Sequence, residues 1–411
     1  MNSTDRLNLN EVCAGLDGFL AAEVYPRHER YAEILDNPRR RHDASGVYSG
    51  EAVALIKEVR QASAEAGFYT LTLPPPIGSV DLGWEGLYRL WEHLFYRCGT
   101  RMWLGHHVLA HWTKGPNPLL MHAQEPVRDR YLGALESGSK SMCFGMSEPE
   151  AGSDIWSMRS RATPVDGGWQ LSGVKQWISN GSHADLAVVF AISEPELARA
   201  RKGGIGAFLV PMDSPGVARG PVSPMFGQIG SNEATLYFDD VFVPDDHVVG
   251  DPLNGFGHAL TGVSLGRAYN CAKVVGLSYW ALDIARAHAN TRTAFGSKLG
   301  DMQAIAFKLA DQAIEAHSAR VVAIDTFRRL DIGADAANEL AIAKVVCTEM
   351  AVRTIDAAMQ VLGAMGFTNE VGLSEAWQMA RVVCVADGSA EILRRQVARR
   401  FLREGLPLVG A

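Results

Sequence analysis

The order of helical and strand-forming segments is the feature that most constrains the fold of this chain. The first third has the apolar spacing of amphipathic helices, most clearly at 51–67 and 81–112, with a shorter pattern at 125–135. The middle consists of short runs of β-branched and aromatic residues between turns, and the last part is helical again. Few enzyme architectures have this order. It predicts an α+β multidomain protein with an N-terminal α-helical domain (1–140), a middle β domain (141–252) and a C-terminal helical domain (253–411).

The middle segment has strand patterns that no helical pattern separates. They cover 168–171, 186–191, 207–211 and 235–243, and glycine- and aspartate-rich turns bound them. A parallel sheet needs crossover helices, so these strands favour a small sandwich or barrel over a parallel βαβ sheet.

The helical patterns of the last segment are long. In 301–330 and in 335–362, apolar residues recur at intervals of three and four, and a short loop separates the two patterns. Long helices joined by short loops predict an antiparallel four-helix bundle.

Composition excludes several classes of protein. The 411 residues carry 39 basic and 46 acidic side chains, a net charge of −7, without a long basic run, so nucleic acid is an unexpected partner. No run of about 18 apolar residues predicts a membrane span. The polar start, 1–10, has no signal-peptide pattern, and the six cysteines are scattered singly. We therefore expect a cytoplasmic protein with reduced thiols.

Several common active-site motifs are absent or incomplete. The glycines at 203–206 do not form a dinucleotide fingerprint, no P-loop occurs, and 145–149 lacks the second glycine of a nucleophile elbow. His107 and His111 are four residues apart on a predicted helix and could share a face. Without a matching glutamate or a third ligand, they are better explained as ordinary helix histidines, and no metal is predicted.

Two unusual strings, 143–154 and 175–181, are candidates for a binding site. The extended segment 144–147 could offer backbone groups and a hydroxyl to a planar polar ring, and the turn at 150–154 exposes N–H groups and the Ser153 hydroxyl to an anion. In the second string, Trp177 and Ser179 share a face if the backbone is extended. The alternatives are a strand-entry turn that binds nothing and a surface hairpin with a half-buried tryptophan.

These strings resemble the acyl-CoA dehydrogenase family. The residues at 146–154 are similar to its first signature, 175–181 to its flavin-packing strand, and 236–244 to the exit from its β domain. Further similar segments follow in family order over essentially the whole chain, and the family has the same α–β–α order. These segments are 292–296 with Gln303, 360–367 and 387–391.

The resemblance implies FAD as cofactor and assigns its contacts position by position. Ser147 would contact the polar edge of the flavin, Trp177 would pack on its other face, and Ser179 would lie near N5, which accepts hydride. Other matched positions would contact the pyrophosphate and the adenosine half. The complete implied set is Phe144, Met146, Ser147, Gly152, Ser153, Trp177, Ile178, Ser179, Arg292, Phe295, Gln303, Gln360, Gly363, Ser389 and Glu391.

For the substrate, the resemblance implies an acyl-CoA thioester. Arg267 matches a family arginine near the CoA portion, although a solvated helix face would also explain it, and Ser153 would also lie near the pantetheine arm. Family members remove an α-proton while the β-hydrogen leaves as hydride to flavin N5.

Asp387 occupies the position of the usual catalytic glutamate. The alternative glutamate position, used by the isovaleryl branch, falls on Gly266, so Asp387 is the matching carboxylate. Burial against the flavin would raise its pKa. A competing role is the N-cap of the helix predicted at 390–402, for which Ser389 is a second candidate.

Aspartate at the base position bears on the substrate. Its carboxylate is drawn back by about 1.5 Å relative to glutamate, a displacement that can cost about 100-fold in rate. Ala386 stands where straight-chain enzymes commonly have an aromatic residue, and the space favours a bulky, branched or cyclic acyl group. Ile229 replaces a frequent family arginine, which puts one cofactor-domain contact in doubt.

The resemblance also implies partners: an electron-transfer flavoprotein as acceptor and a homo-oligomer, a dimer of dimers, because some cofactor contacts reach a neighbouring subunit's flavin. Three alternatives remain. The first is a flavin oxidase of the nitroalkane oxidase type, which also has aspartate at the base position. The others are a dehydrogenase of carrier-protein-bound acyl groups and a catalytically idle family member that acts as a binding or protective protein. Arg267 favours CoA over the first. DNA-binding idle relatives have a basic C-terminal extension, unlike 406–411.

Overall fold

The structure is a computed structural model that describes residues 8–405, apart from the side chain of Thr261. It forms two compact units, and the N-terminal segment contributes to both. The sheet unit comprises Ala21–Asp81 and His107–Val263; the helical unit comprises the described parts of Met1–Leu20, Leu82–His106 and Ser264–Ala411. The domain boundaries at 140 and 252 therefore stay a prediction.

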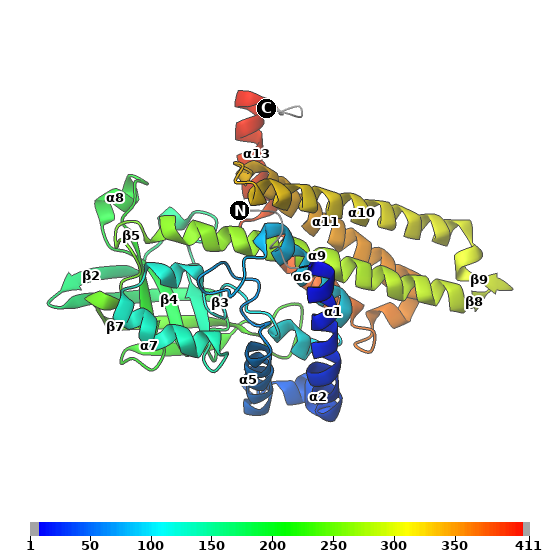
Figure 1. The fold of residues 1–411 in the computed structure, drawn as a ribbon, viewed down its shortest axis with the longest axis horizontal. Helices are drawn as coiled ribbons and strands as arrows, with labels where there is room; N and C mark the ends of the chain where they lie inside the picture. The colour runs from blue at the N-terminus through cyan, green and yellow to red at the C-terminus, as the bar shows by residue number, and fades with distance from the viewer. Residues whose placement is uncertain (1–7, 406–411) are drawn as a thin grey trace. The chain divides into compact units, whose positions relative to one another are not determined.

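The sheet unit contains a curled seven-stranded sheet in the order β1-β4-β2-β3-β7-β6, with β5 paired to β4 (Figure 1). β1 pairs with β4 in parallel, whereas β3, the central long strand, is antiparallel to both of its neighbours. All four predicted strand patterns are present. The strands are β1 (Met142–Gly145), β2 (Arg161–Val165), β3 (Gly168–Ser179), β4 (Leu186–Ile192), β5 (Ile205–Pro211), β6 (Val217–Val222) and β7 (Glu233–Pro244).

Strand β4 contributes to an apolar layer on each face of the sheet because alternate side chains of a strand point to opposite faces. Leu186, Val188 and Phe190 pack in one buried cluster with apolar residues of α7 (Glu125–Glu136), which covers this face (Figure 1). Ala187 and Val189 pack in a second cluster with residues of β5 and β7. The continuous apolar run of β4 is thus explained by burial on both faces.

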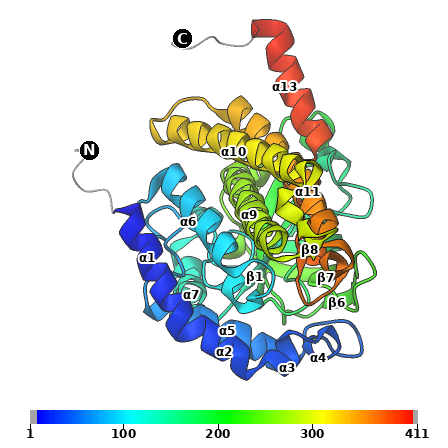
Figure 2. The same ribbon diagram turned by 90° about the vertical axis from the view of Figure 1, so that its right-hand side faces the viewer.

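The helical unit is built from long helices, two of which, α10 and α11, pack side by side. The Thr354 hydroxyl donates a hydrogen bond of 3.1 Å to the side-chain oxygen of Gln312, and the Cys347 thiol donates one of 3.5 Å to the Ala319 carbonyl, so the two helices run antiparallel. At the N-terminal side, α1 runs beside α6 (Figure 2). The helices are α1 (Leu9–Phe19), α6 (Gly83–Cys98), α9 (Gly255–Thr291, which begins in the sheet unit), α10 (Gln303–Asp331), α11 (Ala337–Leu362), α12 (Leu373–Val383) and α13 (Ala390–Glu404).

Shorter elements connect these. In the helical unit, β8 (Thr293–Ala294) and β9 (Ser297–Lys298) form a hairpin between α9 and α10, at the end of the bundle away from α13 (Figure 1). None of the described helices combines the length and apolar character that crossing a membrane requires. The remaining helices are α2 (Tyr25–Arg30), α3 (Ala32–Leu35), α4 (Pro38–Arg41), α5 (Gly50–Glu65), α8 (Pro195–Arg199) and the short turns Leu20–Val24, Trp103–His107, Pro118–His122, Ile155–Ser157, Asp245–His247, Leu299–Asp301 and Gly363–Phe367.

The continuous helix predicted for 81–112 is wrong. α6 ends at Cys98 because Gly99 adopts φ +50°, and a Cβ there would lie 2.1 Å from the Trp280 indole. His107 is the last residue of a separate short helical turn and His111 lies beyond it. The shared helix face that would have paired these histidines does not exist.

Candidate active site

The segment after β1 contains the predicted flavin-facing residues, and a buried ion pair holds it. The backbone N–H of Gln176 in β3 donates to the carbonyl of Ser147 at 2.9 Å, so this segment runs beside β3. Lys175 Nζ donates to the Met146 carbonyl at 3.3 Å and to Glu148 Oε1 at 2.6 Å. The carboxylate of Glu148 also accepts the backbone N–H groups of Arg159 and Ser160.

This ion pair is ionised at neutral pH. Burial lowers the pKa of Lys175 to about 8, although Glu148 opposes the shift. Burial alone would raise the pKa of Glu148, but the Lys175 ammonium and the donated hydrogen bonds bring it below its usual range. A buried charged pair of this kind fixes the geometry of the segments that it joins.

Trp177 is presented outward by an unusual backbone conformation. The pairing of β3 with β7 shifts register between Lys175 and Ile178, and Trp177 within this bulge has φ +64° and a side chain that is 51 % exposed. The extended conformation expected through 175–181 is therefore interrupted at Trp177. Ile178 is buried, and the Ser179 hydroxyl donates to Glu233 at 3.2 Å, so this hydroxyl retains only its acceptor capacity for a ligand.

The other predicted residues of the sheet unit differ in exposure. Phe144 packs with its ring centroid 4.8 Å from those of both Trp112 and Phe190, so it belongs partly to the core. Gly152 and Ser153 lie exposed on the following turn. The proposed anion site on this turn stays a prediction.

Asp387 lies in the loop between α12 and α13 and is half-buried. Asn270 Nδ2 donates a 2.7 Å hydrogen bond to its Oδ2, and Arg267 Nε donates a 3.2 Å bond to its backbone carbonyl. Both donors lie on α9, one helical turn apart. Asp387 has φ +53°, and Ser389, rather than Asp387, caps α13 by accepting the N–H of Ile392.

Lys344 of α11 binds the same loop from the other side. Its side chain is completely buried, and Nζ donates to the carbonyls of Ala386 at 2.8 Å and Gly388 at 2.7 Å. These two carbonyls flank Asp387 in the chain. The backbone conformation around the carboxylate is thus fixed by the side chains of two helices.

Burial raises the pKa of Asp387 above its ordinary value, and four neighbours oppose this shift. The opposing groups are Lys344, the Asn270 hydrogen bond, Arg267 and Lys273. Burial also lowers the pKa of both Lys344 and Arg267, while the Asp387 charge raises them. Asn270 and Lys344 are not among the residues predicted from the sequence; each is a polar residue among apolar helix positions, the one signal that could have marked them.

The remaining predicted cofactor residues of the helical unit lie in two places. At the tip of the β8–β9 hairpin, Phe295 and Gly296 have φ +51° and +82°, the combination of a type I′ turn, and the Phe295 ring is 100 % exposed. Arg292 and Gln303 lie exposed beside this hairpin in the chain.

Gln360 and Gly363 are exposed at the C-terminal end of α11. Because the contacts of Gln312 with Thr354 and of Ala319 with Cys347 set α10 and α11 antiparallel, Gln303 and Gln360 lie at the same end of the bundle. Ser389 and the exposed Glu391 are instead next to Asp387 at the start of α13.

Comparisons with known proteins agree with this architecture. The family description "Acyl-CoA dehydrogenase, C-terminal domain" matches residues 254–402, and "Acyl-CoA dehydrogenase, middle domain" matches residues 143–241. The chain is 35 % identical to the human mitochondrial short-chain specific acyl-CoA dehydrogenase over 286 residues, 70 % of this chain and 69 % of that one. The chain belongs to the acyl-CoA dehydrogenase family. It is therefore an FAD-dependent oxidoreductase.

Two further similarities extend over more of the chain. A probable acyl-CoA dehydrogenase of Bacillus subtilis is 34 % identical over 312 residues, 76 % of this chain and 81 % of that one. The solved acyl-CoA dehydrogenase of Geobacillus kaustophilus has a TM-score of 0.82 at 22 % identity and covers 98 % of this chain and 100 % of that one. The structural likeness establishes the fold.

Within each unit, residues at the predicted cofactor positions have the chemistry that a flavin cofactor requires. The half-exposed indole of Trp177 and the fully exposed ring of Phe295 are both held outward at positive φ, although such backbone costs free energy for a non-glycine residue. The partly exposed Ser147 hydroxyl and the exposed Arg292 guanidinium suit the polar edge of a flavin and a pyrophosphate, respectively.

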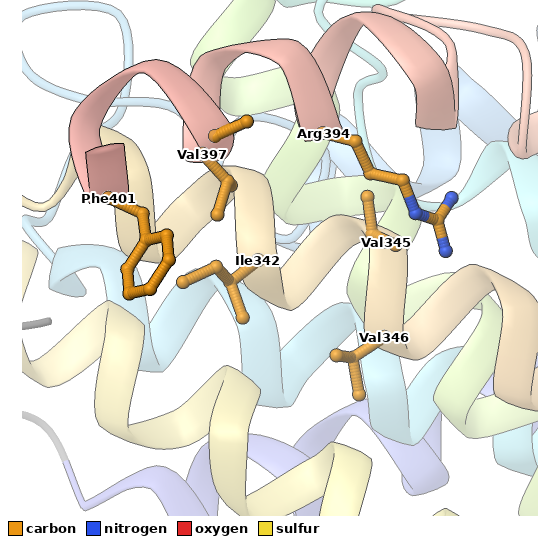
Figure 3. Close-up of a pocket in the computed structure, with 7 residues that line it drawn as sticks. Ile342, Val345, Val346, Arg394, Val397 and Phe401 are labelled. Carbon is orange, nitrogen blue, oxygen red and sulfur yellow. The ribbon is translucent and has the colours of Figure 1, made fainter. Parts of the chain in front are cut away.

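A separate apolar groove of about 390 Å³ lies between α11 and α13 (Figure 3). Ile342 and Val345 from α11 face Val397 and Phe401 from α13 across it (Figure 3). The Phe401 side chain is 51 % exposed, and the neighbouring Leu402 is 82 % exposed. The groove and these two side chains form an exposed apolar surface.

Proposed function

We propose that this enzyme introduces an α,β double bond into an acyl-CoA thioester, with Asp387 as the base that removes the α-proton. The observation that carries the proposal is the environment of Asp387. Its carboxylate is half-buried, held by Asn270, and its pKa is raised by burial. A general base needs a raised pKa and a fixed position, and a carboxylate used only as a helix cap needs neither.

The reaction divides between the cofactor and the chain. When bound, FAD supplies the two-electron acceptor for the β-hydrogen. Asp387 takes the α-proton, and the electron pair of that C–H bond becomes the second bond between Cα and Cβ. Lys344 and Arg267 hold the backbone on which Asp387 sits, through the carbonyls of the loop. A fixed carboxylate avoids the rate loss that a displacement of about 1 Å can cause.

A bulky, branched or cyclic acyl group is the proposed substrate class. The shorter aspartate requires the α-hydrogen to approach the loop more closely, and the neighbouring Ala386 leaves space beside it. A relative of this chain is named short-chain specific, so a short straight acyl group is the natural comparison.

The proposed acceptor of the electrons is an electron-transfer flavoprotein, and the proposed assembly is a dimer of dimers. Phe295 supports a homo-oligomer because its aromatic ring is fully exposed on a turn with positive φ and is not packed against the described residues of its own subunit. The apolar groove between α11 and α13 offers a second surface that another copy would cover.

The test is an anaerobic titration of the FAD-loaded enzyme with straight, branched, cyclic and aryl acyl-CoAs, read as loss of the oxidised flavin band. We expect bleaching with a branched or cyclic member and slow reoxidation in air. The Asp387→Asn variant, with FAD bound, should bleach about 1,000-fold more slowly. Bleaching by a nitroalkane alone, with rapid reoxidation and peroxide release, would replace this function by that of an oxidase. Bleaching only by an acyl group bound to a carrier protein would mean that the proposed reaction is right but the CoA substrate is wrong.

A further inference from the structure

Asn270 is a polar residue in an otherwise apolar stretch of α9. Its side chain is 2 % exposed, and Ala268, Cys271 and Ala272 around it are completely buried. A buried amide costs free energy unless its groups are hydrogen-bonded. Asn270 Nδ2 donates a hydrogen bond of 2.7 Å to Asp387 Oδ2, across 117 residues of chain.

This contact differs from the other contacts to the Asp387 loop. Lys344 and Arg267 bind backbone carbonyls, whereas Asn270 binds the carboxylate itself. Within the part of the chain that the structure describes, Oδ1 of Asp387 accepts no hydrogen bond. The two oxygens of the carboxylate are therefore not equivalent.

We propose that Asn270 is a positioning residue for the base: it holds Oδ2 of Asp387 and leaves Oδ1 as the oxygen that receives the α-proton. This inference rests on the proposed function. An aspartate side chain turns about two bonds, and a single hydrogen bond to one oxygen, with the backbone fixed, orients the carboxylate plane. Orientation of a reacting group is worth orders of magnitude in rate.

Asn270 also acts on protonation without carrying charge. The charged groups that face Asp387 are Lys344 on α11 and Arg267 and Lys273 on α9, and the Tyr269 hydroxyl is a further titratable neighbour whose pKa the Asp387 charge raises. Replacing any of these cations changes the net charge of the site. Replacing Asn270 by leucine, a side chain of similar size, removes the hydrogen-bond donor and leaves the net charge of the site unchanged.

The test compares Asn270→Leu and Asn270→Asp with Asn290→Leu, an exposed asparagine on the same helix, as the matched control. Two quantities are measured on FAD-loaded protein. The first is anaerobic flavin reduction by the best acyl-CoA as a function of pH. The second is an infrared titration of the Asp387 carboxyl band, assigned by its loss in Asp387→Asn.

For Asn270→Leu we expect kcat to fall by about 10- to 100-fold, with KM changed by less than about three-fold, since orientation and not substrate binding is lost. The acidic limb of kcat and the infrared pKa should both move to higher pH. Asn270→Asp should move them further, because two adjacent carboxylates share a proton. Asn290→Leu should match the wild type. If Asn270→Leu folds poorly, Asn270→Ser, which keeps a short polar group, should give an intermediate shift.

The inference is overturned if Asn270→Leu, with FAD bound, behaves like Asn290→Leu in both measurements. Failure of the proposed function gives a different result: no acyl-CoA reduces the wild-type flavin. The infrared titration still reports in that case whether Asn270 controls the Asp387 carboxyl.

Discussion

Lys175 Nζ lies 2.6 Å from Glu148 Oε1, and neither side chain is more than 4 % exposed. This pair joins the middle of β3 to the segment that follows β1, where Met146 and Ser147 lie. The same lysine donates to the Met146 carbonyl. The position of the predicted flavin-facing segment therefore depends on a charge pair beneath it.

Removing one partner of this pair should destabilise the enzyme. Glu148→Gln leaves the buried Lys175 ammonium without its counter-charge, and we expect the free energy of unfolding to fall by about 3 kcal/mol. The variant should also lose FAD more readily. Urea unfolding of the apoprotein and the flavin absorbance after gel filtration measure these effects.

The control for this change is the double variant Glu148→Gln/Lys175→Met, which removes both charges. It should recover most of the lost stability, because an apolar pair costs no desolvation. The exposed pair of Glu196 with Arg199 gives a matched surface control, and Glu196→Gln should change stability by less than about 1 kcal/mol. Equal losses from Glu148→Gln and Glu196→Gln would contradict the importance of the buried pair.

Asp387→Asn should separate stability from activity. Burial raises the pKa of Asp387 in the folded state, so its contribution to stability is greatest when it is protonated and is lost as pH rises through the folded pKa. A neutral asparagine does not ionise, so the variant does not lose stability as the pH rises. Asparagine also tolerates the positive φ of this position. At pH 7 to 8 we expect an unchanged or higher melting temperature, together with a fall in the rate of flavin reduction of about 1,000-fold.

The activity of the wild-type enzyme should fall at low pH. Activity requires the ionised Asp387, so kcat/KM should decrease as pH falls through a pKa above the ordinary aspartate value. Stopped-flow reduction between pH 4 and pH 9 measures this. A profile that is flat to the low end of the range would contradict the raised pKa.

Lys344→Met should disturb the base without touching its side chain. The variant loses the two hydrogen bonds to the carbonyls of Ala386 and Gly388, and the loop around Asp387 loses its anchor. Because the ammonium lowers the pKa of Asp387, its removal should move the acidic limb of kcat/KM to higher pH, and kcat should fall about ten-fold or more. The exposed Lys308 supplies the control, and Lys308→Met should leave both quantities unchanged.

Much of the fold could be predicted because side-chain periodicity records burial. The patterns at 186–191, 301–330 and 335–362 correspond to β4, α10 and α11. The pattern fails where tertiary contacts decide. α6 ends where Gly99 adopts a positive φ against the Trp280 indole, and β3 continues past Leu171 through a buried lysine that is paired with Glu148.

The residues of the candidate site were also only partly predictable from the sequence. Asp387 could be found from the sequence because it lies within a family motif. Asn270 and Lys344 could not, because their role exists only where the chain brings them to a loop 117 and 42 residues away. Local sequence does not encode which distant carboxylate or carbonyl a buried donor will meet.

Phe295 provides the last prediction, in which cofactor binding should fall without a loss of stability. The ring is 100 % exposed at φ +51°, so it contributes no packing within its subunit and imposes backbone strain. Glycine adopts this conformation without cost, and Phe295→Gly should leave the stability of the apoprotein unchanged or raise it by up to about 1 kcal/mol. If the ring serves FAD, the same variant should retain less FAD and form a smaller oligomer. Thermal unfolding of apoprotein, flavin content and light scattering measure these three effects.

The control is Phe307→Ala. Phe307 is exposed and lies within α10, where glycine would disturb the helix but alanine keeps it, so this variant should retain FAD. Full FAD retention by Phe295→Gly would show that the exposed ring has no part in binding the cofactor.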